Sequence, residues 1–528
     1  MQNLFLSSRS CTVLLDPEGL FEARQSYDLF LNHSFLRTET RSVASIFNLL
    51  PDQDYLLEAQ SGDRLLTLTF HTPAERISLD ARAFGAKGDG IHDDTPALQA
   101  AILSCPQGGR VRVPAGTYRT GPLFLKSHTT LELQKGCTLK LLTDRSAFPV
   151  LPGVTYPTGN QQEYLLGSWE GNPLDCYAAA LTGIGVEDVR IIGEGVVDGS
   201  GTEGDWWQNP KVRRGAWRGR LFYLRDCQHI TVQGITFRNS PSWNLHPCFS
   251  QHLSFLNIRI EAPYHSPNTD GFDPESCSDI RVLGTVFSVG DDCIAIKAGK
   301  IYMGQTYQTP CENMEVAYCA MLKGHGGVTV GSEMAGGVRN IHVHHCLMKG
   351  NDRGLRIKSR RGRGQNGVID NIRFEDIRME DVKAPLTVNA FYYCDPDGHS
   401  SYVQTREKMP VDKNTPSIGS IVFHRVHATG CTACIAWVLG LPERPMSLLE
   451  IRDSSFHFCP WDEAPLMAPV MADNSPEVRH YGIHAEFIET LSLHHLTVQG
   501  RGGSHALMET NAIEKLDAQP GDLQELPD

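Results

Sequence analysis

The sequence predicts an all-β protein in which a parallel β-helix follows a small β-sandwich. From about Thr130 onward, alternating β units recur every 24 to 34 residues or so, which is roughly the length of one coil of such a helix. Each unit has an alternating run, a polar or glycine break and a second alternating run, as in residues 230–237, 280–287 and 372–379. No unit can bury its inward face alone, so the coils must stack. The expected domains are residues 1–75 and residues 76–528.

The first domain is predicted from short alternating strands separated by turn residues such as Asn32 and Pro51. It resembles a fibronectin type III module. Residues 50–55, Leu-Pro-Asp-Gln-Asp-Tyr, match that family's turn before a strand tyrosine, and residues 70–73, Phe-His-Thr-Pro, match its exit. Such modules are usually spacers, so no chemistry is assigned to it. The predicted strands are residues 11–15, 26–31, 42–47, 55–59 and 65–70.

A glycine-rich turn and one helix are predicted at the start of the second domain, over residues 84–102. Thr95 is expected to cap this helix, and Pro96 suits the first turn because its missing N–H costs nothing there. Its apolar face would close the exposed end of the stacked coils. Nearby Asp89, Asp93 and Asp94 could suggest a metal site, but helix capping explains them better.

The 15 cysteines are too sparse for a disulfide framework. Cys227, Cys277 and Cys311 each lie three residues before the first apolar residue of a coil strand, so we expect them to stack as buried thiols. Cys431 and Cys434 have the spacing of a redox motif without its usual context. We expect them to be two buried residues near a turn.

A net charge of −13 argues against nucleic acid as a partner, and no apolar stretch is long enough to span a membrane. The first 20 residues lack the pattern of a secretion signal. A cytoplasmic location is therefore expected, or a periplasmic or secreted one if a leader has been removed. The sequence gives no indication of the oligomeric state.

Four segments carry the functional residues. Residues 268–273 read Asn-Thr-Asp-Gly-Phe-Asp, and residues 290–297 read Gly-Asp-Asp-Cys-Ile-Ala-Ile-Lys. Residues 324–327 read Gly-His-Gly-Gly, and residues 353–358 read Arg-Gly-Leu-Arg-Ile-Lys. Crowded carboxylates repel one another and are tolerated chiefly where a proton or a water is handled. The pattern indicates acid/base chemistry beside cations that suit an anionic substrate.

In this order and spacing, the four segments resemble the polygalacturonases of glycoside hydrolase family 28. The resemblance covers about residues 80 to 510, including residues 239–247 before the site and residues 440–443 near the end. It implies a right-handed parallel β-helix with an active cleft along one face. It also implies hydrolysis, with inversion, of α-1,4 bonds between galacturonate units.

The resemblance makes Asp291 the general acid, while Asp270 and Asp292 hold and deprotonate the water. An inverting pair is commonly about 6.5 to 9.5 Å apart. Adjacent strand residues point to opposite faces, so Asp291 and Asp292 can share a cleft only if the backbone turns, which Gly290 permits. Mutual repulsion should raise at least one pKa among the three carboxyl groups. Asp273 is expected to brace the motif by hydrogen bonds.

His325 is implied to tune the acid. Arg356 and Lys358 lie two apart on one strand face, and their charges suit the C6 carboxylate of galacturonate. Asn268 and a tyrosine, either Tyr392 or Tyr393, are implied to contact substrate. The neighbouring arginines could form a solvated loop or further substrate contacts, and both remain open: Arg353, Arg360, Arg361 and Arg363.

No cofactor or metal is expected. His342 and His344 share a strand face but have no third ligand nearby. Residues 155–171 and 205–220, with Trp206, Trp207 and Trp217, could wall off one end of the cleft and make the enzyme exo-acting. Alternatives are an endo-polygalacturonase, a rhamnogalacturonan or xylogalacturonan hydrolase, a calcium-dependent pectate lyase, and a non-catalytic β-helix binding protein.

Overall fold

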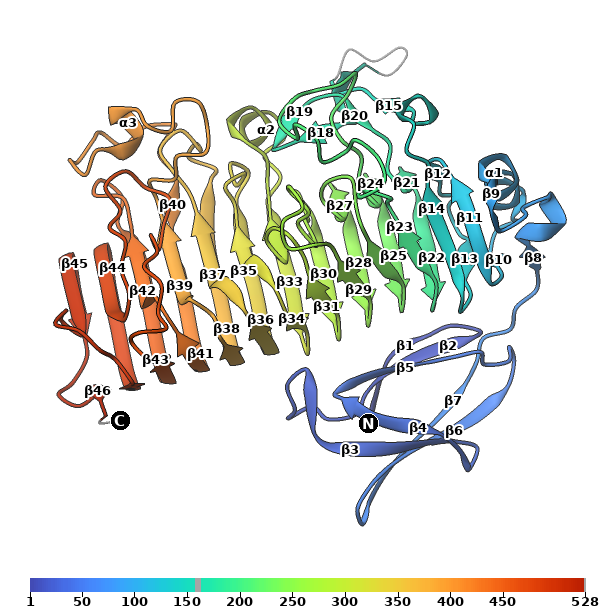
Figure 1. Ribbon diagram of the computed structural model, residues 1–528, viewed down its shortest axis with the longest axis horizontal. Helices are drawn as coiled ribbons and strands as arrows, with labels where there is room; N and C mark the ends of the chain where they lie inside the picture. Colours follow the sequence, from blue (N-terminus) through green and yellow to red (C-terminus); the bar gives the residue numbers. More distant parts are fainter. Residues whose placement is uncertain (157–162, 527–528) are drawn as a thin grey trace.

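The computed structural model describes residues 1–156 and 163–526, most of them in strands (Figure 1). The N-terminal module consists of two antiparallel sheets, with strand orders β1-β2-β5 and β4-β3-β6-β7. Val13, Leu29, Ala44 and Leu57 are fully buried in its core. The predicted sandwich is present, with two further strands: β1, whose Leu4, Phe5 and Leu6 are half-buried, and the mostly exposed β4. The strands are β1 (Gln2–Leu6), β2 (Ser10–Leu14), β3 (Glu22–Leu31), β4 (Ser34–Arg41), β5 (Val43–Phe47), β6 (Asp54–Ser61) and β7 (Arg64–His71).

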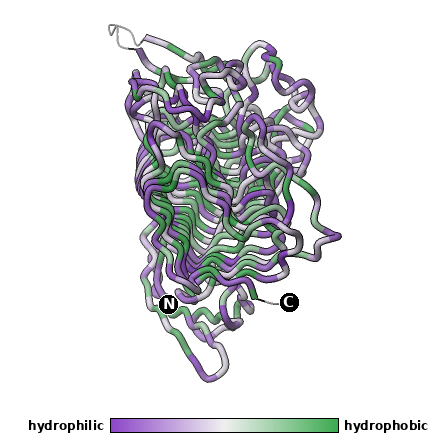
Figure 2. Tube along the Cα trace, turned by 90° about the vertical axis from the view of Figure 1, so that its left-hand side faces the viewer, coloured by the Kyte–Doolittle hydropathy of each residue, from purple (hydrophilic) through white to green (hydrophobic). Residues whose placement is uncertain are grey.

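The rest of the described chain winds into a parallel β-helix, as predicted, and its coils form three sheets. Inward residues of successive coils align in register, for example Ile230 with Leu253, Leu253 with Ile280 and Ile280 with Met314. Viewed along the helix, the hydrophobic stretches of successive coils lie one behind another (Figure 2). Stacking therefore buries the faces that single coils leave exposed.

The first helical sheet contains β8 (Ser78–Asp80), β10 (Arg110–Val113), β13 (Thr130–Leu133), β22 (Glu187–Gly193), β25 (Gln228–Gln233), β28 (Gln251–Leu256), β30 (Ser278–Leu283) and β33 (Cys311–Ala317). The second contains β9 (Asp89–Asp93), β11 (Gly116–Thr120), β14 (Cys137–Leu141), β23 (Val196–Asp198), β26 (Thr236–Arg238), β29 (Arg259–Glu261), β31 (Val286–Ser288), β34 (Ala320–Met321) and β46 (Leu523–Glu525). Longer strands bend from the first sheet into the second: β36 (Val338–Lys349), β38 (Val368–Glu380), β41 (Ser420–Cys431) and β43 (Met446–Phe458).

The third helical sheet carries the candidate site. Its strands are β12 (Leu123–Phe124), β21 (Leu181–Ile184), β24 (Phe222–Arg225), β27 (Leu245–Cys248), β32 (Ile294–Ile296), β35 (Gly324–Val330), β37 (Asn351–Lys358), β39 (Ala384–Asn389), β42 (Cys434–Leu439) and the first part of β45 (Met508–Asp517), which continues into the first sheet. The last long strand, β44 (Tyr481–Gln499), runs through all three sheets.

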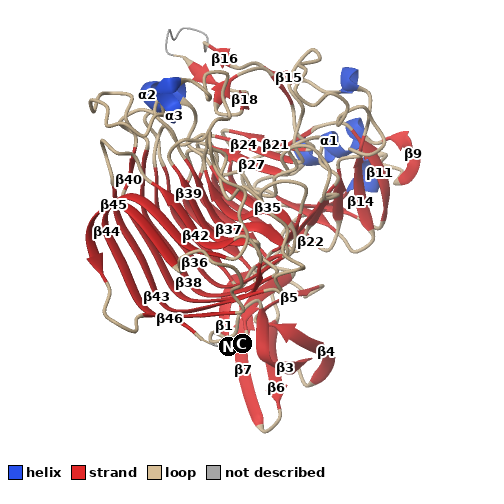
Figure 3. Ribbon diagram, turned by 60° about the vertical axis from the view of Figure 1, so that its left-hand side comes forward, coloured by secondary structure: helices blue, strands red, loops and turns tan. Residues whose placement is uncertain are grey.

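Short elements gather on the side of the β-helix opposite the module (Figures 1 and 3). They are η2 (Arg145–Ala147), β15 (Val150–Leu151), β16 (Val154–Thr155), β17 (Tyr164–Leu165), β18 (Ser168–Trp169), β19 (Asn172–Pro173), β20 (Cys176–Tyr177), α2 (Ile301–Thr306), α3 (Ser401–Gln404) and β40 (Ser417–Ile418). None of the helices in the described ranges is long and apolar enough to cross a membrane.

Helix α1 (Thr95–Ser104) covers the first coils, after the short helix η1 (Ala81–Phe84). Its buried residues Leu98, Ala101 and Ile102 join the core of the β-helix, so the predicted end cover is confirmed. The predicted cap is wrong. The N-cap residue is Asp94, which does not cap the helix because its carboxylate accepts the amides of Lys87 and Gly88 at 2.6 and 3.0 Å.

The predicted thiol column is present in part: the register places Cys277 beside Cys311, whereas Ser250 lies between Cys227 and Cys277. Cys227, Cys277 and Cys311 are buried and free, as are Cys431 and Cys434. Burial raises the pKa of both Cys431 and Cys434, which suppresses the reactive thiolate. Cys431 and Cys434 are therefore buried packing residues, and their spacing does not indicate a redox motif.

The polar or glycine break of each coil is a corner with one residue in the left-handed region. Gly234, Asn257 and Gly284 have φ values of 77°, 52° and 65°. The module packs onto this line of corners, and a Cβ on Gly284 would lie 2.8 Å from Cβ of Val43. Leu14 and Val43 form a small apolar cluster there with Leu256, Leu283, Ala317 and Tyr318.

Gln233 fastens the module to the β-helix from within the interface. Its Oε1 accepts from Ser10 Oγ at 2.6 Å, and its Nε2 donates to Thr12 Oγ1 at 2.7 Å, all three residues being buried. We expect Gln233→Ala to lower the free energy of unfolding by about 1–3 kcal/mol, because two buried hydroxyls lose partners. Urea unfolding measures the change, with exposed Gln228→Ala as control. Equal stability of the two variants would contradict this.

Candidate active site

Asp270, Asp291 and Asp292 meet on the third helical sheet where its ladder is interrupted. Among the described residues, isolated bridges through Phe272 and Glu275 join β27 to β32 at this level. Asp291 and Asp292 precede β32 in a bend, where the amide of Asp292 donates to Oδ1 of Asp291 at 2.9 Å. The nearest side-chain oxygens of the three aspartates all lie within 4.8 Å of one another. The bend brings together two carboxyl groups that a regular strand would separate.

This spacing is shorter than the 6.5 to 9.5 Å expected between acid and base. A water that hydrogen-bonds two oxygens at about 2.8 Å each can bridge roughly 5.6 Å. Two members of the trio can therefore share one water while the third faces a substrate. The short spacing results from placing three carboxyl groups, rather than two, on adjacent coils.

Glycines make this crowding possible. A Cβ on Gly290 would lie 2.5 Å from the carbonyl oxygen of Ser266, and one on Gly326 would lie 2.7 Å from Oδ1 of Asp292. Any side chain at these positions would push the backbone away from the carboxyl groups.

The pKa values of Asp292 and Asp270 are shifted in opposite directions. Burial opposes the charge on Asp292, but Lys358 and Arg356 outweigh it and hold the Asp292 pKa far below its usual range. Burial, and then Asp291 and Asp273, raise the pKa of Asp270 well above its usual range. The predicted raised pKa therefore falls on Asp270, with desolvation as the largest cause. The site contains an ionised carboxylate beside a protonated carboxylic acid.

Asp291 is the most accessible member, with 23% of its side chain exposed. His325 lies beside it, with Nδ1 at 3.4 Å from Oδ1 of Asp291. This contact raises the pKa of His325, and the nearby charge of Asp292 adds to the shift. The predicted acid and its predicted tuning partner are thus neighbours at the mouth of the site.

Arg356 and Lys358 point the same way, but their observed partner is Asp292. Nη1 of Arg356 lies 3.2 Å from Oδ1, and Nζ of Lys358 lies 2.9 Å from Oδ2. The sequence suggested only a substrate carboxylate for this pair. The cross-coil register from β32 through β35 to β37 places both cations over Asp292 instead.

The neighbouring arginines are buried and paired rather than solvated, and Arg353 also lines the pocket formed by Arg356, Lys358 and Tyr392. Arg353 donates to the carbonyls of Ala468 and Pro469, and Arg360 pairs with Asp397. Arg361 pairs with Glu443, and Arg363 pairs with Asp395. All four side chains are largely buried, from 1% to 12% exposed. They hold the loops around the cleft.

Of the two candidate tyrosines, the structure brings Tyr392 to the cations. Nζ of Lys358 lies 5.6 Å from the centre of its ring, whereas the ring of Tyr393 stacks on His399. Asn268 has a left-handed backbone and accepts a hydrogen bond from Arg218 at 2.6 Å. This contact fixes the start of the loop that carries Asp270.

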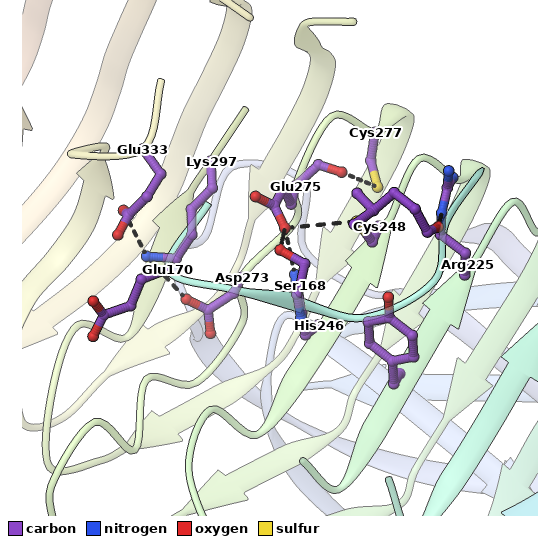
Figure 4. Close-up of polar contacts among 12 residues, drawn as sticks. Ser168, Glu170, Arg225, His246, Cys248, Asp273, Glu275, Cys277, Lys297 and Glu333 are labelled. Carbon is purple, nitrogen blue, oxygen red and sulfur yellow. Dashed lines mark hydrogen bonds and ion pairs between the residues drawn. The ribbon is translucent and has the colours of Figure 1, made fainter. Parts of the chain in front are cut away.

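Sequence reasoning missed a buried ion cluster beside the trio (Figure 4). Nζ of Lys297 lies 3.4 Å from Asp273, 3.4 Å from Glu333 and 4.0 Å from Asp270. Asp273 is held by the ammonium of Lys297, which agrees with a bracing role, although the contact is an ion pair at 3.4 Å and not a short hydrogen bond. Lys297 ends the second motif and could have been suspected, but its partners come from other coils.

A second buried cluster joins His246, Cys248 and Glu275, whose ligand-type atoms lie within 4.8 Å of one another. Oε2 of Glu275 accepts from Ser168 at 2.8 Å and lies 2.9 Å from Nε2 of His246 (Figure 4). These are hydrogen-bond distances centred on one oxygen. We interpret this cluster as a hydrogen-bond network.

The other groups that could bind a metal also lie against charged side chains. The aspartate trio lies against three cations, Lys297, Arg356 and Lys358, which oppose the binding of a divalent ion. His342 pairs with Glu375 at 3.0 Å and His344 with Glu315 at 3.3 Å, as solvent-facing strand residues do.

The cleft is covered on both sides of the trio. On one side, Trp217, Trp169 and Trp243 form a stack with ring centres 5.0 and 5.7 Å apart. Trp206, in contrast, is fully buried in the core, and Trp207 donates to the carbonyl of Ser240. On the other side, the carbonyl of Met471 accepts from Asn389 at 3.0 Å. Of the predicted wall segments, residues 157–162 lie outside the described residues.

Comparisons with known proteins agree with this arrangement. The family model described as glycosyl hydrolases family 28 matches residues 110–413, and a rhamnogalacturonase A/epimerase, pectate lyase-like model matches residues 78–132. A probable polygalacturonase of Vitis vinifera is 32% identical over 71% of this chain and 73% of its own length.

Two solved structures share the fold. The Yersinia enterocolitica family 28 exopolygalacturonase aligns with a TM-score of 0.68 at 19% identity, over 98% of this chain and 99% of that one. A hyperthermoactive exopolygalacturonase from Thermotoga maritima aligns with a TM-score of 0.65 at 25% identity, over 80% of this chain and 93% of that one. The predicted parallel β-helix is confirmed, and the chain belongs to family 28 of the glycosyl hydrolases.

Proposed function

We propose that this glycoside hydrolase cleaves α-1,4 bonds between galacturonate units and works from a chain end. The observation that carries the proposal is the aspartate trio, in which the accessible Asp291 lies beside two buried carboxyl groups, Asp270 and the ionised Asp292. Hydrolysis of a glycoside needs both a proton donor and a carboxylate that activates water. The names of the Vitis vinifera and Thermotoga maritima relatives support galacturonan as the substrate.

Asp291 acts as the general acid because it is the accessible member of the trio. It gives its proton to the glycosidic oxygen as the bond from that oxygen to C1 breaks. A water held between Asp270 and Asp292 attacks C1 from the other side and gives its proton to Asp292. Arg356 and Lys358 keep Asp292 ionised until then, and proton exchange with solvent resets both carboxyl groups. One water attacks directly, so the product is inverted at C1.

The cations near the trio fit an acidic sugar. Arg356 and Lys358 each keep N–H donors beyond those that face Asp292, and Tyr392 lies beside Lys358. A bound galacturonate can place its carboxylate against these donors. The same cations disfavour a calcium-dependent lyase, since calcium would have to bind carboxylates whose charge is already compensated.

One experiment tests substrate, stereochemistry and mode of attack together. We expect polygalacturonate to release monomer or dimer alone from the first minutes, with the inverted anomer seen by proton NMR. A ladder of sizes would contradict exo action. An ultraviolet-absorbing unsaturated product would indicate a lyase. Faster cleavage of rhamnogalacturonan or xylogalacturonan would contradict the unbranched substrate.

A further inference from the structure

The hairpin of β18 and β19 places its two-residue tip, Glu170 and Gly171, against Lys300 and Glu333. The carbonyl of Gly171 accepts from the amide of Lys300 at 2.8 Å. A Cβ on Gly171 would lie 2.8 Å from Cγ of Glu333, so the tip is pressed against the ion cluster described above. Both tip residues have left-handed backbones, with φ values of 46° and 70°. This conformation suits the glycine and is unusual for a glutamate.

The hairpin is held firmly against the coils that carry the site. Trp169 stacks on Trp243, and Ser168 donates to the buried Glu275. Arg220 donates to the carbonyl of Ser168 and lies over the ring of Trp169. Such anchors fix where Glu170 lies relative to the aspartates.

A buried acid next to the tip has unused hydrogen-bonding capacity. Asp273 is 0% exposed; its Oδ1 faces Nζ of Lys297 at 3.4 Å, and its Oδ2 has no hydrogen-bond partner among the described residues. Figure 4 shows Glu170, Asp273 and Glu333 arranged around the ammonium of Lys297. Buried polar atoms without partners are rare and point to a bound ligand or water.

Burial also changes the protonation of these acids. It raises the pKa of Asp273 to about 8 and, together with Glu333, raises the pKa of Glu170. A protonated carboxyl group both donates and accepts hydrogen bonds, as a sugar hydroxyl does.

We propose that Glu170 is a specificity-determining residue that recognises the hydroxyl groups of the terminal galacturonate. This inference rests on the proposed exo action. At a chain end the sugar presents a hydroxyl where an internal unit presents a glycosidic oxygen, which has no hydrogen to donate. A further unit would also bring its own carboxylate against Glu333 and Glu170. A site built to hydrogen-bond a hydroxyl strongly rejects a ligand without it.

Two variants separate recognition from folding. Glu170→Gly removes the carboxyl group and relieves the left-handed backbone, so it should fold at least as stably as the parent. Glu170→Gln keeps the size of the side chain. Glu203→Gln serves as the matched control, because Glu203 lies on the neighbouring insert and pairs with Lys140 near solvent.

The substrates are trigalacturonate and two trimers, one with an unsaturated non-reducing end that lacks the 4-hydroxyl and one reduced at C1. The parent enzyme should cleave one of the two modified trimers much more slowly than it cleaves trigalacturonate. We expect Glu170→Gly to raise KM for trigalacturonate about tenfold or more with kcat little changed, and to lose most of that discrimination. Glu170→Gln should show a smaller change of the same kind.

The outcomes distinguish this inference from the proposed function. If the parent releases only monomer or dimer while Glu170→Gly keeps the parental KM and discrimination, the role of Glu170 is wrong and exo action stands. If the parent produces a ladder of sizes, exo action fails and the inference fails with it.

Discussion

Replacing Asp291 with asparagine should lower kcat on polygalacturonate by about 10³-fold, within the 10²- to 10⁴-fold that a positioned acid supplies. Asparagine has no acidic proton for the leaving oxygen, while it keeps an oxygen for the Asp292 amide that donates to Oδ1 at 2.9 Å. The fold and KM should therefore change little. Release of reducing ends measures the rate.

A second measurement confirms that the substitution acts locally. In the parent, Asp291 raises the pKa of His325, so Asp291→Asn should lower that pKa, which NMR titration of the imidazole detects. Asp279→Asn is the control, since Asp279 lies on a distant exposed face. A variant that keeps more than about a tenth of the parental rate would contradict the role of Asp291, since even a weak general acid supplies more.

The β-helix was predictable because its signals are periodic. Inward residues such as Ile230 and Ile280 follow a period of two, and coil length repeats along the chain, so the stack follows from burial alone. The aspartate trio was predictable for a related reason, since Asp270 and the pair Asp291 and Asp292 lie one coil apart. In a stack of coils, residues that lie one coil length apart in the sequence are neighbours in space.

The remaining features depend on register between coils or on segments without periodicity. Sequence places Arg356 and Lys358 on one strand face but does not show that Asp292 lies against them. The insert strands β18 and β19 have two residues each, which is too short for a hydrophobic period. The sequence therefore did not indicate a role for Glu170. Thr95 failed as a cap because it is the first residue inside the helix and its Oγ1 accepts the amide of Gly121 at 2.7 Å, a contact that sequence does not show.

Lys297 is the residue whose loss should most damage the fold near the site. Its side chain is 4% exposed, and its ammonium pairs with the carboxyl groups of Asp273, Glu333 and Asp270. The same ammonium lies 4.6 Å from the ring centre of Trp243. Methionine fills a similar volume without the charge. We expect Lys297→Met to lower the free energy of unfolding by about 3–5 kcal/mol, because buried carboxyl groups lose their cation. The control is exposed Lys211→Met.

The pH dependence of this loss has a definite sign. Burial alone would raise the pKa of Glu333, but Lys297 and then Lys300 lower it to about 2. A depressed carboxyl pKa stabilises the fold above the unfolded value near 4.5, and this contribution is lost as the pH falls toward 2. In Lys297→Met the Glu333 pKa rises, so the deficit should be largest near pH 7 and should shrink as the pH is lowered toward 4.

A double substitution separates the ion pair from packing. If the deficit comes from the unpaired charge, Glu333→Gln added to Lys297→Met should recover part of the lost stability, since it removes the carboxylate that the cation served. Urea unfolding of the parent, both single variants and the double variant gives the coupling energy. A deficit that is independent of pH, with additive single effects, would mean that Lys297 acts by filling space beside Trp243 and not by charge.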